Sequence, residues 1–425
     1  MIVATLCISL LVLMFIGVPI AISLGLSSMI VLNQQGVPLI ALAQSVFESL
    51  NSFSLMAVPF FILAGNLMQS GGIAQRLINL ANALFGWVRG GLGGVVVLTS
   101  MFFSTMSGSS SATTAAVGSI LIPAMEKKGY PRPFAAAVAA SSGELGSLIP
   151  PSITMIVYAL SVNVSVASVF LGGILPGLLV GISLIICTCV LAWLRDYDMI
   201  EPVSFRQWLI GVLVALKQSF FALLMPVVIL GGIYTGAFTP TEASVVAVIY
   251  GLIIGLFIYR EMNWHDLLDV LGRSAIISAI VLIIVAFASI FAYMLTVNRV
   301  PHMLGALITD ISDNPLIFLM IVNLFLFGVG MFIEALAAII ILAPILAPIA
   351  VQLGIDPIHF AIVMIINLAV GMATPPVGVN LFVVCQVANV NMEQLMRPML
   401  IFLGVLMVDV LIVTYVPILS TWFLP

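Results

Sequence analysis

The stretch that decides the fold is GELGSLIPP, residues 143–151, because it has a counterpart 225 residues further along, LAVGMATPP at residues 368–376. Under this shift Gly146 aligns with Gly371, and both Pro-Pro pairs coincide. Without a gap, the shift also aligns Leu121, Pro123, Gly129, Ala136 and Val138 with Leu346, Pro348, Gly354, Ala361 and Val363. Proline removes a backbone N–H and clashes with the preceding helical turn, so each stretch predicts a break inside an apolar helix. We therefore expect two related halves, at residues 1–210 and 211–425.

The composition is that of a chain embedded in a lipid bilayer. Its 425 residues are 63% hydrophobic and only 7% charged, with a mean hydropathy of +1.32. A soluble protein needs far more charge on its exterior, and the apolar runs are too long for barrel strands. No basic stripe indicates a nucleic-acid partner. The predicted fold class is an all-α polytopic membrane protein.

Each half also contains two apolar arms that are too short to cross a membrane. In the first half they occupy about residues 93–126 and flank the cluster STMSGSSSATT at 104–114; in the second they occupy about 316–350 and flank GVGMFIE at 328–334. A full crossing needs about 20 residues, so each pair predicts a re-entrant hairpin. Non-helical backbone at that depth requires surrounding protein or a watered cavity. The broken helices follow at 134–170 and 358–390.

The other segments are predicted from their apolar length and polar interruptions. Residues 1–32 form one apolar segment bent at Gly17, and Ile73–Trp87, with Arg76 and Arg89, is an amphipathic stretch along a membrane face. Residues 195–217 are a polar connector, and residues 264–271 lie at the interface before a spanning helix that starts at Ser274.

Loop charge predicts that the two halves have opposite orientations. The loop after the first hairpin contains Lys127, Lys128 and Arg132, whereas its counterpart, residues 352–357, contains no Lys or Arg. The positive-inside rule places the first loop in the cytoplasm and the second on the other side. Inverted repeats with interrupted helices in corresponding positions are the plan of many secondary transporters.

The breaks and the hairpin tips are candidate sodium sites. Each Pro-Pro pair frees carbonyls that would cost several kcal/mol if left unpaired in lipid, and a hard cation takes oxygen ligands. Site 1 comprises Ser107, Ser109, Gly146, Ile149 and Pro151, and site 2 comprises Gly330, Phe332, Glu334, Gly371, Thr374 and Pro376. The alternative is a kinked core helix whose freed carbonyls are met by neighbouring Ser and Thr hydroxyls.

The same breaks direct helix N-termini towards the middle of the molecule, where their dipoles attract anions. Hydroxyl residues beside the first tip and the first break are candidates for binding a carboxylate: Ser109, Ser110, Thr113, Ser152 and Thr154. Neither motif contains Arg or Lys, so anion binding must depend on dipoles, hydroxyls and co-bound cations. The alternative role of these small residues is helix packing.

Two acidic residues lie at the depth of the predicted breaks, where ionisable groups are costly and usually functional. Glu334, at the second tip, is the better candidate for a cation ligand. Glu144 aligns with Ala369 rather than with an acid, and a hydrogen bond within the protein explains it equally well.

Two other classes of membrane protein are alternatives. An intramembrane hydrolase would need a base beside a serine of the first tip, but no His lies in a predicted span nearby, so we do not expect an enzyme. An ion channel would need rings of carbonyls or charges along a continuous pore. Inverted hairpin repeats fit alternating access better.

The motifs resemble those of the large membrane subunit (M subunit) of the TRAP transporters, the tripartite ATP-independent periplasmic transporters. The matching segments lie in the family's order: SGSSSAT at 107–113, IPAM at 122–125, GY at 129–130, LG at 145–146, IPPSI at 149–153, LPG at 175–177, FTPTEA at 238–243 and TPPVG at 374–378. One departure is the second tip, which has far fewer hydroxyls than the first. The two ion sites are therefore not expected to be equivalent.

The resemblance implies a sodium-driven importer in the bacterial inner membrane, with both hairpins in a moving elevator domain. It implies a soluble periplasmic protein that delivers an organic acid, such as a C4-dicarboxylate or sialic acid, and a small membrane subunit. We expect that subunit to be a separate chain, because no helical block precedes Met1. The stretch SSGELG at 141–146 is closer to the sialic acid branch.

Overall fold

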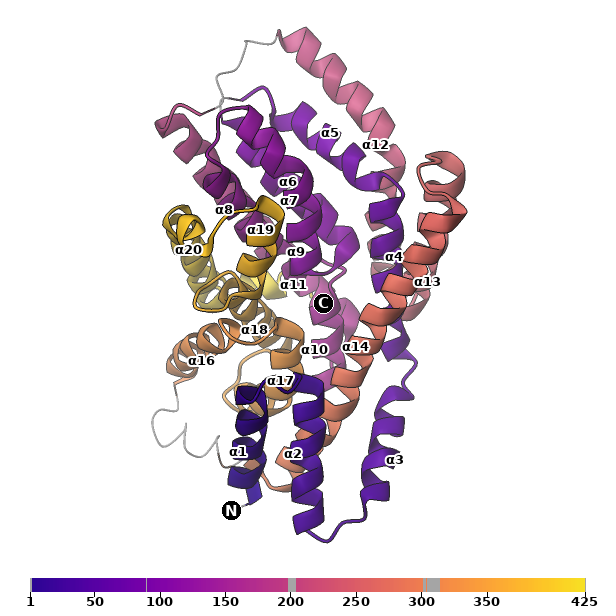
Figure 1. Ribbon diagram of the computed structural model, residues 1–425, viewed down its shortest axis with the longest axis vertical. Helices are drawn as coiled ribbons and strands as arrows, with labels where there is room; N and C mark the ends of the chain where they lie inside the picture. Colours follow the sequence, from indigo (N-terminus) through magenta and orange to yellow (C-terminus); the bar gives the residue numbers. More distant parts are fainter. Residues whose placement is uncertain (1, 89, 198–203, 301–302, 304–313, 425) are drawn as a thin grey trace.

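The computed structural model describes residues 2–88, 90–197, 204–300, 303 and 314–424 (Figure 1). Within these ranges the chain is helical and contains no strand. The first half holds α1 (Ile2–Phe15), α2 (Ile20–Gln34), α3 (Leu39–Leu50), η1 (Ser54–Met56), α4 (Ala57–Ser70), α5 (Ile73–Phe85), α6 (Gly91–Ser107), α7 (Ser110–Lys127), α8 (Arg132–Gly143), α9 (Leu145–Leu148), α10 (Ile153–Val162) and α11 (Val166–Leu194). The second half holds α12 (Phe205–Tyr234), α13 (Pro240–Ile253), η2 (Ile254–Ile258), α14 (Trp264–Val297), α16 (Pro315–Gly330), α17 (Ala335–Gln352), α18 (Pro357–Met372), α19 (Val379–Ala388), α20 (Met392–Tyr415) and α21 (Ile418–Thr421).

Length and hydropathy make this a multi-pass membrane protein. In the described part of the chain, seven helical segments are long and apolar enough to cross a bilayer, or eight if α3 and the helix after it form one bent span. Of the four predicted hairpin arms, α6 and α16 are shorter than these segments. The prediction that every arm is too short to cross is wrong for α17, which at 18 residues is itself one of the seven. The predicted all-α membrane fold class is therefore confirmed.

The interrupted helices lie where the Gly and Pro spacing predicts them. The first helix is interrupted between Leu148 and Ile153, and the second between Met372 and Val379. The peptide bonds Pro150–Pro151 and Pro375–Pro376 are both cis. The first continuation ends at Val162 rather than near Phe170, because Asn163 adopts a left-handed conformation, with φ of 58°. The side chain of Ser165 then caps α11.

Three predictions outside the breaks need correction. The N-terminal segment is interrupted at Gly17 as predicted, but the chain turns there (φ 90°) and α1 packs against α2, so the segment forms two helices rather than one bent segment. The connector is helical from Phe205 onward, where Ser204 and Gln207 form a capping box; its residues 198–203 lie outside the described ranges. The interfacial stretch after Asn263 continues without a break into α14.

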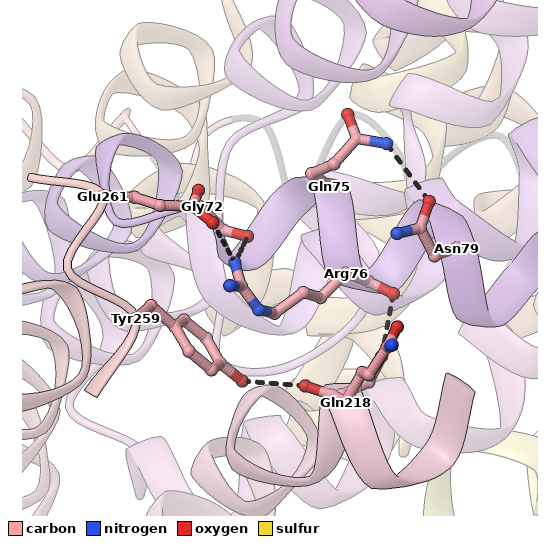
Figure 2. Close-up of polar contacts among 8 residues, drawn as sticks. Gly72, Gln75, Arg76, Asn79, Gln218, Tyr259 and Glu261 are labelled. Carbon is pink, nitrogen blue, oxygen red and sulfur yellow. Dashed lines mark hydrogen bonds and ion pairs between the residues drawn. The ribbon is translucent and has the colours of Figure 1, made fainter. Parts of the chain in front are cut away.

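The amphipathic stretch forms α5, whose apolar face packs against α6 and α12 rather than lying free on a membrane surface. Arg76 links α5 to α12 and to the segment between η2 and α14 (Figure 2). Its Nη1 lies 2.6 Å from Glu261 Oε1 and donates to the Gly72 carbonyl, and its guanidinium lies 3.5 Å from the centre of the Tyr259 ring. Ser219 of α12 donates to the Arg76 carbonyl. The predicted flanking Arg89 lies outside the described residues.

The two halves interlock around the hairpins. Helix α10, which continues the first broken helix, packs against α17 of the second half, and α19, which continues the second, packs against α7 of the first. Helices α2, α3 and α4 pack along α14, and α13 packs against α4 (Figure 1). The hairpin tips and the helix breaks therefore meet beside α4 and α14.

Candidate functional site

The first tip and the first break are in direct backbone contact. Helix α6 ends at Ser107, Gly108 turns the chain with φ of 59°, and Ser109 caps α7 by accepting from Ala112 N–H. A Cβ on Gly146 would lie 2.4 Å from the Ser109 carbonyl oxygen, and a Cβ on Gly108 would lie 2.9 Å from that of Pro151. These two glycines allow four of the five residues of predicted site 1 to come together.

The fifth residue of predicted site 1, Ile149, lies at the same break but packs outward. It follows the last residue of α9, and its side chain lies against Gly177 of α11. The structure thus places Ile149 next to the Pro-Pro pair, with its side chain directed away from the tip.

Hydroxyl groups satisfy part of the first break. The Ser147 carbonyl, which loses its usual donor because Pro151 has no N–H, accepts from Ser152 Oγ at 2.7 Å and from Thr154 Oγ1 at 3.1 Å. For this one carbonyl the structure agrees with the alternative of a kinked helix whose freed oxygens are met by neighbouring hydroxyls. The Gly146 carbonyl faces Pro150 in the same way, and among the described residues no side chain donates to it. One carbonyl freed by the first Pro-Pro pair therefore has no side-chain donor among the described residues.

The second tip and break repeat this contact with less polar chemistry. A Cβ on Gly371 would lie 2.6 Å from Gly330 Cα, so the two backbones touch. Thr374 is buried, and its hydroxyl donates to the Val370 carbonyl at 2.7 Å. The side chains of Phe332 and Pro376 are exposed, whereas Glu334 is half-buried and immediately precedes α17. The structure thus brings Gly330, Gly371 and Thr374 together.

Equivalent hydrogen bonds join each tip to its break. Ile153 N–H, at the start of α10, donates to the Gly108 carbonyl at 3.1 Å. Gly378 N–H, at the start of α19, donates to the Met331 carbonyl at 2.9 Å. Ile153 and Gly378 are themselves related by the 225-residue shift. Each hairpin is therefore fastened to the helix that resumes after its own break.

A cavity of about 430 Å³ lies between the tips and the opposing helices α4 and α14. Four helix N-termini line it, those of α7, α10, α17 and α19. The lining includes Ser107–Ala112, Ser147, Ile153, Thr154, Glu334–Leu336 and Val379 on one side, and Ile62, Asn66, Gln69, Ile277, Ile280 and Ile284 on the other. No Lys, Arg or His from the described chain lines this cavity. The dipoles at four helix ends favour an anion in this cavity, whereas Ile153 N–H is already bonded to the Gly108 carbonyl and the acid Glu334 lies in the same wall.

The predicted substrate residues divide between the cavity wall and the layer behind it. Ser109, Ser110 and Thr154 line the cavity. Thr113 and Ser152 are fully buried: Thr113 Oγ1 lies 2.7 Å from Ser107 Oγ, and Ser152 Oγ lies 2.6 Å from Thr154 Oγ1. Thr113 and Ser152 therefore hold residues of the wall in place.

The sequence analysis missed the polar side chains of the opposite wall. Asn66 and Gln69 of α4 line the cavity, and Asn66 Nδ2 donates to Ser274 Oγ of α14 at 2.8 Å. The available signal was two amides three residues apart, and so on one helical face, in an otherwise apolar run. These amides add hydrogen-bonding groups that face the first hairpin tip.

A known protein family matches most of the chain. The family described as "Tripartite ATP-independent periplasmic transporter, DctM component" matches residues 7–419. The chain is 44% identical to the C4-dicarboxylate TRAP transporter large permease protein DctM of Pseudomonas aeruginosa, over 89% of this chain and 88% of that protein. It is 37% identical to the sialic acid TRAP transporter large permease protein SiaM of Vibrio cholerae, over 95% and 94%.

Among solved structures, the fold is similar to that of the Alcanivorax borkumensis YdaH transporter. The TM-score is 0.67 with 17% identity, over 90% of this chain and 88% of that chain. The relatives are named as transporter permeases rather than enzymes. The chain belongs to the DctM component family, the large permeases of the tripartite ATP-independent periplasmic transporters.

Proposed function

We propose that the protein takes up an organic acid by coupling its movement to sodium. The observation that carries this proposal is the convergence of four helix N-termini and two interrupted helices on one cavity, to which the described part of the chain contributes no basic side chain. Helix ends favour a carboxylate, while the carbonyls and hydroxyls around them favour a hard cation. An anion held without Arg or Lys gains from co-bound sodium ions, which links the two ligands energetically.

The substrate is proposed to be a C4-dicarboxylate or sialic acid, since these are named for the relatives described above. Both ligands carry at least one carboxylate, which suits the N-termini of α7 and α10. Their polar remainder can reach Asn66 and Gln69 across the cavity. The stretch at 141–146 suggested the sialic acid branch. The identity to the dicarboxylate permease is higher than that to the sialic acid permease, so the overall identities do not support that preference.

Sodium is proposed to bind at both breaks. Site 1 has the hydroxyls of Ser107 and Ser109 and the Gly146 carbonyl, to which no described side chain donates. Site 2 has Glu334 at the tip and backbone oxygens around Gly371 and Thr374. The two donor sets differ, so the ions they hold are expected to bind with different affinities.

The movement is proposed to be an elevator, built on two inverted repeats. One support is that α10 of the first half packs against α17 of the second hairpin, while α19 of the second half packs against α7 of the first. The other is the pair of equivalent hydrogen bonds donated by Ile153 and Gly378. The hairpins and broken helices would move together past α4 and α14. This arrangement also implies that the loops after the two hairpins lie on opposite sides of the membrane.

Single cysteines test this orientation. In a chain whose native cysteines are replaced, we expect a membrane-impermeant maleimide to label Gln352→Cys in intact cells and Lys128→Cys only after permeabilisation. Both positions are exposed at the ends of α17 and α7. Labelling of both from the same side would contradict the inverted repeats.

The partners are proposed to be a soluble periplasmic binding protein and a small membrane subunit, in the bacterial inner membrane. Uptake into liposomes containing both permease subunits, with the binding protein outside, tests the function. We expect accumulation of a C4-dicarboxylate or sialic acid under an inward sodium gradient and a loss of accumulation when potassium replaces sodium. Uptake that ignores this replacement, or unitary currents typical of a channel, would contradict the proposal.

A further inference from the structure

A buried hydrogen bond joins the two interrupted helices. Asn380 Nδ2, in the first turn of α19, donates to Glu144 Oε1 at 2.6 Å. Glu144 precedes α9, two residues before Gly146, and is 3% exposed, while Asn380 is fully buried. The two residues are 236 positions apart and belong to different halves of the chain. This contact therefore connects one break with the helix that follows the other.

The bond is one step in a continuous path between the hairpin tips. At the first tip, Ser110 Oγ donates to the Glu144 carbonyl at 3.4 Å and lies 2.6 Å from Ser147 Oγ. At the second tip, Gly378, two residues before Asn380, donates to the Met331 carbonyl. Hydrogen bonds and two short stretches of backbone thus link the two tips through Glu144 and Asn380.

Neither side chain lines the cavity, so neither is placed to contact substrate. The pair is also poorly satisfied, because Glu144 Oε2 and Asn380 Oδ1 are buried and find no hydrogen-bond partner among the described residues. Buried unsatisfied polar groups destabilise a fold, and well-packed apolar residues often replace such a pair without loss of stability. Stability alone therefore does not explain this pair.

We propose that the Glu144–Asn380 hydrogen bond couples the two ion sites, so that sodium bound at one break raises the affinity at the other. Glu144 and Asn380 act as positioning residues. The inference rests on the proposed sodium coupling and adds to it a mechanism for cooperativity. Energetic coupling between sites is reciprocal, so breaking the bond weakens both sites together.

The test is the sodium dependence of uptake in proteoliposomes that contain the complete transporter. In Asn380→Leu, which keeps the number and branching of the side-chain heavy atoms but removes the amide, the half-saturating sodium concentration should rise about 5-fold or more, the lower end of typical coupling. The Hill coefficient should fall towards one, while the maximal rate at saturating sodium is retained. Glu144→Leu should have the same effects as Asn380→Leu. In the double variant, the half-saturating sodium concentration should be no higher than in either single variant.

Two further variants separate coupling from a structural role. In Glu144→Gln the amide oxygen accepts the same bond and the new NH₂ group can donate to Asn380 Oδ1, so wild-type cooperativity should be retained. Ser183→Ala removes a hydrogen bond that also joins the halves, Ser183 Oγ to Asp409 Oδ2 at 2.5 Å between α11 and α20. Because Ser183 and Asp409 belong to neither break and to neither hairpin tip, cooperativity should be unchanged.

The possible contradictions are distinct. If Asn380→Leu lowers the thermal stability but leaves the cooperative sodium dependence of uptake unchanged, the proposed coupling is overturned. The proposed function is not affected by that result. Equal loss of cooperativity in Ser183→Ala would also overturn it, since any bond between the halves would then suffice. Wild-type uptake indifferent to sodium would overturn both proposals.

Discussion

Gly146→Ala is expected to cause a large loss of sodium-dependent uptake, because the added methyl group pushes the first tip away from the first break. The new Cβ would lie 2.4 Å from the Ser109 carbonyl oxygen and 2.8 Å from the Ser110 nitrogen. Both atoms belong to the backbone of the first tip and cannot move as a flexible side chain would. The tip must therefore separate from the break, and the oxygens of predicted site 1 move apart.

The size of the effect follows from the cost of overpacking, which is typically about 1–3 kcal/mol. If this cost destabilises the sodium-bound state and not the sodium-free state, the sodium affinity of site 1 falls about 5- to 150-fold, since each 1.4 kcal/mol is a factor of ten. The measurement is initial uptake against sodium concentration, with substrate saturating. We expect a raised sodium requirement and a shallower curve.

The matched control is Gly404→Ala. Gly404 lies within α20, and a Cβ there meets no atom within 4 Å. Alanine in a helix is favoured over glycine by about 0.5–1 kcal/mol, so this variant should insert and transport at least as well as wild type. Normal sodium affinity in Gly146→Ala would show that contact between tip and break is not needed.

The second large effect is expected within α16, where two glycines stand two residues apart. In Gly330→Ala the Cβ would lie 2.8 Å from the Leu368 carbonyl oxygen and 2.9 Å from Gly371 Cα. It must therefore push the second tip away from the second break. Gly328→Ala, by contrast, adds a Cβ with no atom within 4 Å.

Gly330→Ala and Gly328→Ala therefore add the same methyl group to the same helix, two residues apart. They differ in whether that methyl group meets the second break. We expect Gly330→Ala to lose most sodium-dependent uptake and Gly328→Ala to retain it, measured at equal amounts of protein in the membrane. Equal uptake by the two variants would contradict a role for the second tip. Equal loss would indicate that α16 tolerates no added methyl group, whatever its contacts.

The breaks were predictable because Gly and Pro act locally. The Pro-Pro pairs end their helices whatever lies around them, and Gly108 alone accounts for the sharp turn at the first tip. Helix lengths that depend on polar residues were predicted less well. Asn163 ended α10 early by adopting a left-handed conformation, which is a property of the turn and not of apolar periodicity.

The site was predictable on one side only. Ser109, Ser110 and Thr154 belong to motifs that the repeat marks, whereas Asn66 and Gln69 reach the cavity because α4 packs against α6 and α14. The bond between Glu144 and Asn380 spans the two halves in the same way. Contacts set by long-range packing leave no periodic signal in a single sequence.

The account depends most on whether the two interrupted helices bind sodium. The direct measurement is equilibrium binding of radioactive sodium to the purified chain in lipid nanodiscs, for wild type, Gly146→Ala, Gly330→Ala and Gly404→Ala. We predict saturable binding to wild type and to Gly404→Ala, with one class of site lost in each of the other two variants. Absence of saturable binding to wild type, or unchanged binding in Gly146→Ala and Gly330→Ala, would contradict it.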